Sequence, residues 1–437
     1  MQYNSDTCVN TKRGDRRMSA PTAGGTDSGE AALGINTKSA SPQTPCKVPP
    51  AQRTRGLRDT RYALQTSIRR LVIAKSDFDP ENPDLDVYNK LPRVTKCKWV
   101  RVKPTVDIKH AMAENKAHYC NLTTCGSVWT CPVCAHRVQE IRRQEIHRGV
   151  EWAKSVGLQP VMLTLTTPHY SHQSCADLLT RLSAAHKYLV SGKAWVNFKN
   201  SVGYQGMIRS LETLYGKSGW HSHFHVLWFV DASADLDSIA DFVLTRWEKA
   251  CQKQKLIPKG KLRAFRSHSV KVSLAHNSGE YLAKQDDEKY MVRWGADREI
   301  AKGNSKTYRE KSGLLHPFEL AGFWAEHGDP KAADLFMEYL EAFKGKAQIF
   351  WTQGLKIRAG INEVSDKEAA EAEYEDSVKV MSLESFAWDL VRSKGMRSKV
   401  LTMIESGGVE DVENWLRFHG MNSVLSHEMP LINSLRK

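Results

Sequence analysis

The alternation of apolar and polar residues is most regular between Gln205 and Val230. Two runs rich in β-branched, aromatic and aliphatic residues flank a short turn bounded by Gly216 and Gly219, which predicts a β-hairpin. Side chains of a strand alternate between its two faces, so histidines at every second position of the second run share one face. These histidines are His221, His223 and His225.

The turn also sets the register of this hairpin. If Tyr215 pairs with Trp220, Glu212 lies directly opposite His223. Directly opposed residues lie roughly 5 Å apart, so the carboxylate would lie beside two imidazoles. Two nitrogen ligands and one carboxylate oxygen suit a divalent ion such as Mg²⁺, Mn²⁺ or Zn²⁺. We therefore predict a metal site at Glu212, His223 and His225; the alternative is that the histidines are ordinary strand residues.

Hydrophobic periodicity predicts the elements around the hairpin. Helical spacing predicts helices at residues 62–75, 137–156, 172–200, 238–255 and 335–343. Apolar or alternating runs predict strands at residues 159–167 and 268–274, with a further strand candidate at 99–104. An acid-rich segment at 363–376 indicates an exposed linker, and two or three short helices are predicted within 377–420. The pattern as a whole indicates an α+β fold with strand 159–167 beside the hairpin.

Composition and charge narrow the class of partner. The 437 residues, 41% of them hydrophobic, suffice for two or three domains with real cores. A net charge of +14 indicates a polyanionic partner, and basic segments at 53–110 and 253–311 are consistent with contacts to a phosphate backbone. Residues 1–52 contain few large apolar residues and are expected to be a disordered basic tail.

The sequence has no apolar run long enough to cross a bilayer and no secretory signal at its amino terminus. We therefore expect a cytoplasmic protein without a membrane partner. The nine cysteines are odd in number and mostly scattered, which argues against a disulfide framework.

Four cysteines are an exception, because they are clustered and end in a CPxC knuckle. Their spacing predicts a small tetrahedral zinc site, with a redox CxxC or free buried thiols as the alternatives. His118 or His136 could replace one thiol. The predicted structural zinc ligands are Cys120, Cys125, Cys131 and Cys134.

The segment WHSHFHVL, with LET upstream, resembles the metal motif of the HUH endonucleases, in particular the rolling-circle replication initiators of bacterial and archaeal plasmids. The resemblance implies an α+β core of antiparallel sheet flanked by helices, with Mg²⁺ or Mn²⁺ at the histidine pair. A similar order of carboxy-terminal motifs extends the resemblance over residues 115–358. His221 is expected to support the metal ligands or to contact the substrate.

The segment after strand 268–274 resembles the third motif of this family. Asn277 or Ser278 can cap a helix there, which would place Tyr281 and Lys284 on one face. The resemblance implies that Tyr281 is the nucleophile and that Lys284 helps to orient or stabilise the charged groups. Gln285 stands where some relatives have a second tyrosine, so we predict a one-tyrosine enzyme. Tyr290 is the alternate nucleophile, and a packed structural tyrosine is the plain alternative.

These predictions give five parts: a tail at 1–52, a basic region with the zinc module at 53–158, a nicking domain at 159–311, an extension of the core at 312–361, and an acidic linker with a small helical module at 362–437. The resemblance implies an initiator that nicks origin DNA, single-stranded at the nick, and works with a host helicase and polymerase. A relaxase, a transposase, or a non-catalytic zinc protein that binds nucleic acid are the rival functions.

Overall fold

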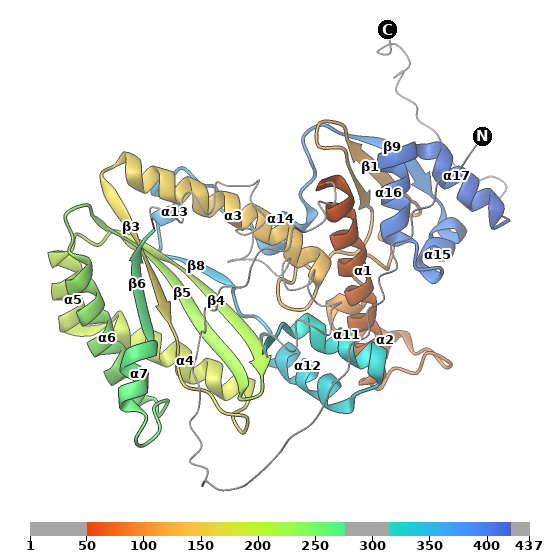
Figure 1. Ribbon diagram of the computed structural model, residues 1–437. Coiled ribbons are helices and arrows are strands. Elements are labelled where there is room, and N and C mark those ends of the chain that lie inside the picture. Colours follow the sequence, from red (N-terminus) through yellow and green to blue (C-terminus); the bar gives the residue numbers. More distant parts are fainter. Residues whose placement is uncertain (1–49, 276–313, 421–437) are drawn as a thin grey trace, which may run out of the picture. The chain divides into compact units, whose positions relative to one another are not determined.

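The computed structural model describes residues 50–275 and 314–420 (Figure 1). Its larger sheet is antiparallel and has six strands, in the order β6-β3-β5-β4-β7, with β8 also paired to β4. The strands are β3 (Leu158–Leu165), β4 (Gly206–Gly216), β5 (Gly219–Asp231), β6 (Val270–Leu274), β7 (Leu314–Leu315) and β8 (Ile349–Trp351). Antiparallel sheets flanked by helices confirm the predicted α+β class.

The hairpin β4-β5 has the predicted register. Tyr215 is opposite Trp220 and Glu212 is opposite His223. The two glycines that bound the turn also pair with each other, so the turn itself consists of the two residues between them. As predicted, β3 pairs with β5 along its length. The pairing follows from local pattern, because a shift by one residue would turn the apolar side chains of β5 to the opposite face.

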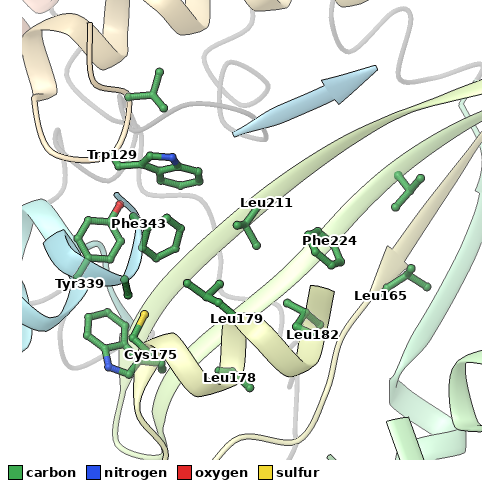
Figure 2. Packing of buried hydrophobic residues seen from close by; sticks show 14 of the residues in the cluster. Trp129, Leu165, Cys175, Leu178, Leu179, Leu182, Leu211, Phe224, Tyr339 and Phe343 are labelled. Carbon is green, nitrogen blue, oxygen red and sulfur yellow. The ribbon is translucent and has the colours of Figure 1, made fainter. Parts of the chain in front are cut away.

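One face of the larger sheet packs against α4 (Cys175–Leu189) and α6 (Leu236–Lys253). Figure 2 shows Leu179 and Leu182 of α4 near Leu211, Phe224 and Leu165 of the sheet. All five side chains are at least 93% buried. Each large apolar side chain removed from water contributes about 1.5–3 kcal/mol, so this face supplies much of the hydrophobic stabilisation.

The opposite face carries the histidines. There, Ile146 and Val150 of α3 (Pro132–Ser155) pack in one cluster with Leu227 and Phe229 of β5. These two β5 residues share the face of His221, His223 and His225 because the side-chain period of a strand is two. Helix α3 thus covers one end of that face, and the histidines lie beyond it along β5.

A smaller antiparallel sheet has the order β2-β1-β9, formed by β1 (Val106–Ala111), β2 (Lys116–Cys120) and β9 (Ser377–Leu383). It packs with α15 (Ser385–Ser393), α16 (Arg397–Gly407) and α17 (Val409–Phe418) in a second core around Trp388. The helix predicted to begin near 377 is therefore wrong over 377–383, which is a strand. The strand candidate at 99–104 is also wrong, because only Arg101 forms a bridge there.

The remaining helices complete the covering layers. They are α1 (Pro50–Ala74), α2 (Leu85–Lys90), the 3-10 helix η1 (Arg93–Thr95), α5 (Gly192–Ser201), α7 (Leu262–His268), α11 (Pro317–His327), α12 (Pro330–Ala342), α13 (Leu355–Arg358) and α14 (Asp366–Glu371). The single helix predicted at 172–200 is two helices, because Gly192 has φ +78°. The acidic segment predicted to be an exposed linker contains α14, whose Asp366 accepts from Arg142 at 2.8 Å.

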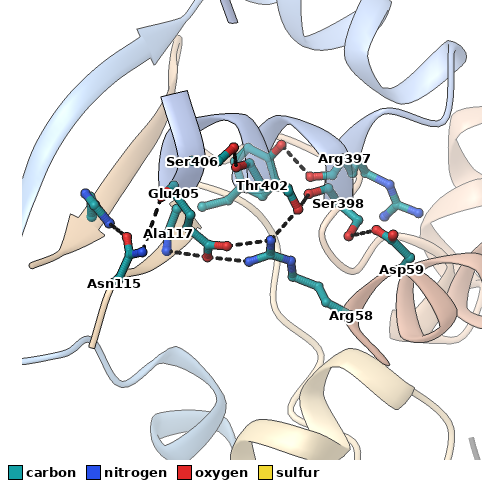
Figure 3. A network of polar contacts seen from close by, with 11 residues as sticks. Arg58, Asp59, Asn115, Ala117, Arg397, Ser398, Thr402, Glu405 and Ser406 are labelled. Carbon is teal, nitrogen blue, oxygen red and sulfur yellow. Dashed lines mark hydrogen bonds and ion pairs between the residues drawn. The ribbon is translucent and has the colours of Figure 1, made fainter. Parts of the chain in front are cut away.

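Polar contacts join the first helix to the carboxy-terminal helices (Figure 3). Arg58 of α1 forms a bidentate pair with Glu405 of α16, at 2.5 and 2.8 Å, and also donates to Thr402. The same Glu405 accepts from the backbone N–H of Ala117 in β2 at 2.9 Å. One carboxylate therefore connects α1, α16 and the smaller sheet. Within the described ranges, no helix is long and apolar enough to cross a membrane.

Candidate functional site

Glu212 of β4 and His223 and His225 of β5 converge on one point of the larger sheet. Glu212 Oε2 lies 3.0 Å from His223 Nε2 and 3.2 Å from His225 Nε2. The two Nε2 atoms are 3.0 Å apart. The hairpin register and the strand period produce this arrangement, so the structure brings together the three predicted ligands.

The electrostatics of Glu212 fit a carboxylate that stays ionised. Burial raises the pKa of Glu212, but hydrogen bonds from His223 and His225 outweigh it and hold the pKa far below the usual range. The side chain of Glu212 is still 36% exposed, against 10% for His223. One carboxylate oxygen and two imidazole nitrogens, gathered where solvent reaches the carboxylate, are donors that suit a divalent ion with open positions.

Thr164 of β3 contacts the ring nitrogen of His225 that does not face Glu212. Its Oγ1 lies 3.3 Å from His225 Nδ1, because Thr164 and His225 are directly opposed in the β3-β5 pairing. A partner on one ring nitrogen orients the ring and leaves the other nitrogen directed at the site. Strand β3 therefore contributes a positioning side chain that the hairpin alone could not reveal.

Two further histidines lie near the site. His169, just after β3, has its Nδ1 3.2 Å from Nδ1 of His221. Burial, and then the charges of His223 and His169, lower the pKa of His221 to about 3, so this imidazole is neutral at physiological pH. The candidate ligand atoms that lie within 4.8 Å of one another come from Glu212, His223 and His225, so His221 lies beside this group rather than in it.

His316 was not singled out from the sequence. It caps α11 directly after β7, and the pairing of Leu315 with Tyr215 brings it to the β4 edge. Burial lowers its pKa to about 4, opposed by the nearby charge of Glu212. The local sequence could not predict the position of His316, because that position depends on the pairing of Leu315 with Tyr215, which lies 100 residues earlier.

The predicted nucleophile belongs to a segment that the structure does not describe. Tyr281, Lys284, Gln285 and the alternate Tyr290 all lie outside the described residues. The described chain before them ends next to β6, whose Leu274 pairs with Val161 of β3.

The cysteine cluster differs from the predicted set by one member. Cys97, rather than Cys120, joins Cys125, Cys131 and Cys134. Cys120 is at the end of β2, where its thiol donates to Glu373 at 3.1 Å. The structural reason is that the 98–100 segment hydrogen-bonds to Thr123, at 2.7 and 2.8 Å, which carries Cys97 to the loop that follows β2.

The geometry of the four thiols fits a tetrahedral metal. Sulfur–sulfur distances are 3.4 Å for Cys97–Cys134, 3.6 Å for Cys125–Cys134 and 3.7 Å for Cys97–Cys131. A zinc ion with bonds of about 2.3 Å requires edges of about 3.8 Å. The backbone N–H groups of Cys125 and Ser127 donate to sulfur at 3.4 Å. Cys131 is the N-cap of α3, so the helix holds two of the thiols in place.

A buried polar chain continues from this cluster. Gln65 of α1 donates to Cys131 Sγ at 3.2 Å and accepts from Arg397 at 2.8 Å. The Arg397 side chain lies over the ring of Trp99, 4.8 Å from its centre, and the residue is 3% exposed. Among the described residues no carboxylate forms an ion pair with this guanidinium, so the cysteine cluster is the natural source of compensating negative charge.

Comparison with known proteins identifies the family of the chain. A family model described as "Replication protein" matches residues 114–394, which contain both the hairpin and most of the cysteine cluster. The protein "Protein rep" of Streptomyces lividans is 26% identical over 302 residues, covering 55% of this chain and 64% of that protein. A "Neomycin resistance protein" of Streptomyces cyanogenus is 30% identical over 132 residues, covering 24% of this chain and 30% of that protein.

The chain thus spans less than two thirds of the length of either relative. No solved structure matches it. The family model nevertheless covers more than half of the chain, and it includes the hairpin whose residues suggested the resemblance. The chain belongs to this family of replication proteins.

Proposed function

We propose that the protein is a plasmid rolling-circle replication initiator that nicks one strand of origin DNA by metal-dependent transesterification. The observation that carries the proposal is the convergence of Glu212, His223 and His225 within 3.2 Å of one another on one face of the sheet, where the Glu212 side chain is 36% exposed. Family membership supports a role in replication, and the metal-ligand set supports phosphodiester chemistry.

The three ligands would hold a divalent ion, Mg²⁺ or Mn²⁺, in positions that the hairpin fixes before substrate arrives. Such an ion, when bound, supplies Lewis-acid polarisation of the scissile phosphate, which is worth several kcal/mol. His223 and His225 would act as ligands through their neutral imidazole nitrogens. The neutral His221 next to them can donate or accept a hydrogen bond at the phosphate.

Tyr281 is the proposed nucleophile. Its hydroxyl oxygen bonds to phosphorus as the bond to the 3′ oxygen breaks, which leaves a 5′-phosphotyrosyl link and a free 3′-OH after proton transfer. The proposal gives Lys284 the task of stabilising charge beside it. The new ester retains the energy of the broken one, so the strand can be rejoined by the reverse reaction without ATP.

DNA is the proposed partner because the net charge is +14. The nick site is proposed to be single-stranded, so that one backbone can reach the histidine face. A host polymerase would extend the free 3′-OH, and a host helicase would open the duplex. The four-thiol cluster is proposed to bind structural Zn²⁺, because its sulfur–sulfur distances fit a tetrahedral ion.

The test is formation of a covalent protein–DNA adduct. The protein is incubated with Mn²⁺ and labelled single-stranded oligonucleotides that tile the DNA flanking its own gene, and the DNA-linked peptide is identified by mass spectrometry. We expect the adduct on Tyr281, its loss in Tyr281→Phe, and its retention in the matched control Tyr290→Phe.

An adduct on Tyr290 would move the nucleophile and keep the reaction. An absence of any adduct or nick, with DNA binding retained, would refute the proposed chemistry and favour a non-catalytic zinc protein. Loss of the adduct in Glu212→Ala with normal DNA binding would connect the reaction to the metal ligands.

A further inference from the structure

A third group of side chains that could hold a metal ion lies on the smaller sheet. His118 and Cys120 occupy alternate positions of β2, so both project from the face opposite Ala117 and Tyr119, which are buried in the core of that sheet. Glu373 reaches the same face from the segment between α14 and β9. One donor atom from each of the three side chains lies within 4.8 Å of the others.

Cys120 and Glu373 have polar contacts in this group, whereas the described residues provide no hydrogen-bond partner for the His118 ring. Cys120 Sγ lies 3.1 Å from Glu373 Oε1, and Lys109 holds the other carboxylate oxygen at 2.6 Å. Both ring nitrogens of His118 are buried and, within the described part of the chain, have no hydrogen-bond partner. A buried polar group without a partner costs free energy comparable to a lost hydrogen bond, so a native protein rarely retains one without a ligand.

We propose that His118, Cys120 and Glu373 bind a Zn²⁺ ion that is separate from the four-cysteine cluster. One imidazole, one thiolate and one carboxylate suit zinc better than magnesium or calcium, which take oxygen ligands. The Cys120 sulfur and the Glu373 oxygen are 3.1 Å apart, and a tetrahedral zinc ion would hold such a pair at ~3.5 Å, so a small outward movement of either side chain makes room for the ion. A small movement of the His118 ring brings its nitrogen to the same ion, and the fourth position is left for water.

Lys109 has a supporting role in this site. It is directly opposite His118 in the β1-β2 pairing and forms an ion pair with Glu373 at 2.6 Å. An ion pair of this kind fixes the carboxylate so that its other oxygen faces the thiol and the imidazole. Carboxylates that bind metals are commonly hydrogen-bonded in this way.

The ion would fasten two distant parts of the chain together. Cys120 and Glu373 are 253 residues apart. The segment of Glu373 is also held by Arg137 of α3, which donates to the carbonyl of Ala372 at 2.7 Å. A metal bridge across so long a loop removes much of the freedom of the unfolded chain, so it would stabilise the attachment of β9 to β1.

The experiment measures zinc content of the full-length protein after extensive dialysis, by native mass spectrometry and elemental analysis. The variants are Cys120→Ser and His118→Gln, with His110→Gln as the matched control, because His110 lies on the same sheet and bonds to Asn115. We expect each site variant to contain one equivalent of zinc fewer than the wild type, and the control to contain the same amount. Zinc at the four-cysteine cluster, and any zinc that occupies the Glu212 site in place of Mg²⁺ or Mn²⁺, cancels in this difference.

Cobalt substitution provides a second readout. The charge-transfer band reports thiolate–metal bonds, so Cys120→Ser should lose one of five thiolate ligands and His118→Gln should shift the spectrum. If a site variant does not fold, Glu373→Gln is used instead, because the Glu373 side chain is 43% exposed and its replacement should disturb the fold least. Equal zinc content and equal cobalt spectra in the wild type and the folded site variants would overturn the proposal.

Discussion

If the four-thiol cluster binds zinc as proposed, replacing Arg397 with methionine should destabilise the zinc-loaded protein much more than the zinc-free protein. In the structure Arg397 donates to Gln65 Oε1, Thr66 Oγ1 and the carbonyl of Lys98, at 2.8, 2.7 and 3.0 Å. It is 3% exposed and has no carboxylate partner among the residues described. Four thiolates with one Zn²⁺ carry a net charge of about −2, which this buried cation would balance through Gln65.

The expected magnitude follows from the two states of the cluster. With zinc bound, Arg397→Met removes one member of a buried charge pair, which costs about 3–5 kcal/mol. Without zinc the thiols can be neutral, so the substitution then removes no charge pair and costs only the hydrogen bonds to Gln65, Thr66 and Lys98, which are lost in both states. The difference in unfolding free energy between the two states should therefore be at least about 3 kcal/mol, or roughly 100-fold in zinc affinity by linkage.

The assay is urea unfolding of both proteins with zinc and after chelation, together with competition against a chelator of known affinity. The matched control is Arg392→Met. Its guanidinium lies over the same Trp99 ring but pairs with the exposed Asp389, so it should change stability by less than about 1 kcal/mol in either state. Equal losses with and without zinc, or an unchanged zinc affinity in Arg397→Met, would refute the charge compensation.

Three further outcomes are expected. Gly219→Ala should lower the free energy of unfolding by about 1–3 kcal/mol in thermal unfolding, because Gly219 has φ +93° and an added Cβ would lie 2.8 Å from the carbonyl oxygen of Tyr170. Thr164→Val should weaken Mn²⁺ binding about 10-fold or more in isothermal titration, because His225 loses its partner. Burial, and then the charge of a nearby arginine, lower the pKa of His186 to about 3, so the unfolded state takes up the proton first. The stability that the neutral His186 contributes is complete above pH 6.5. As the pH falls from 6.5 towards 3, the free energy of unfolding decreases by ~1.4 kcal/mol per pH unit. His186→Gln should therefore flatten the acid limb of the stability curve.

Matched controls isolate each cause. Gly157→Ala also replaces a glycine of positive φ, +78°, but an added Cβ there meets nothing within 4 Å, so the excess loss in Gly219→Ala measures the steric contact. Thr180→Val is on the surface of α4 and should leave Mn²⁺ affinity unchanged. His172→Gln removes an exposed imidazole and should keep the wild-type acid limb. If the control and the test variant behave alike in any pair, the stated reason for that prediction is wrong.

The candidate metal site was predictable because its ligands are close in sequence. Residues at positions 221, 223 and 225 share a face by the geometry of a single strand, and a short turn fixes which residue of the preceding strand lies opposite. Both relations are local, so the pairing of Glu212 with His223 follows from the sequence alone.

The fourth thiol was not predictable in this way. Cys97 is 28 residues before Cys125, and it reaches the cluster only because the segments around it hydrogen-bond to each other. Cys120 has the more regular spacing, yet the direction of β2 places its side chain with His118 and Glu373. Spacing along the chain does not determine distance in space when a strand lies between the residues.

The strand β9 is a second feature that the local sequence did not determine. Residues 377–383, SVKVMSL, mix apolar and polar positions in a pattern that fits a strand or the start of a helix equally well. The segment is a strand because it pairs with β1, about 270 residues earlier in the chain. This pairing gives hydrogen-bond partners to backbone groups of both β1 and β9.

The sequence by itself determined which side chains share each face of the hairpin, the register of the hairpin and the three converging candidate ligands, since these depend on backbone geometry within a few residues. Only the tertiary structure decided which distant segments supply the fourth thiol, the support of Thr164 and the neighbouring His316. Those contacts form because separated chain segments pair and bury surface together, and the free energy of that association is not contained in any local pattern.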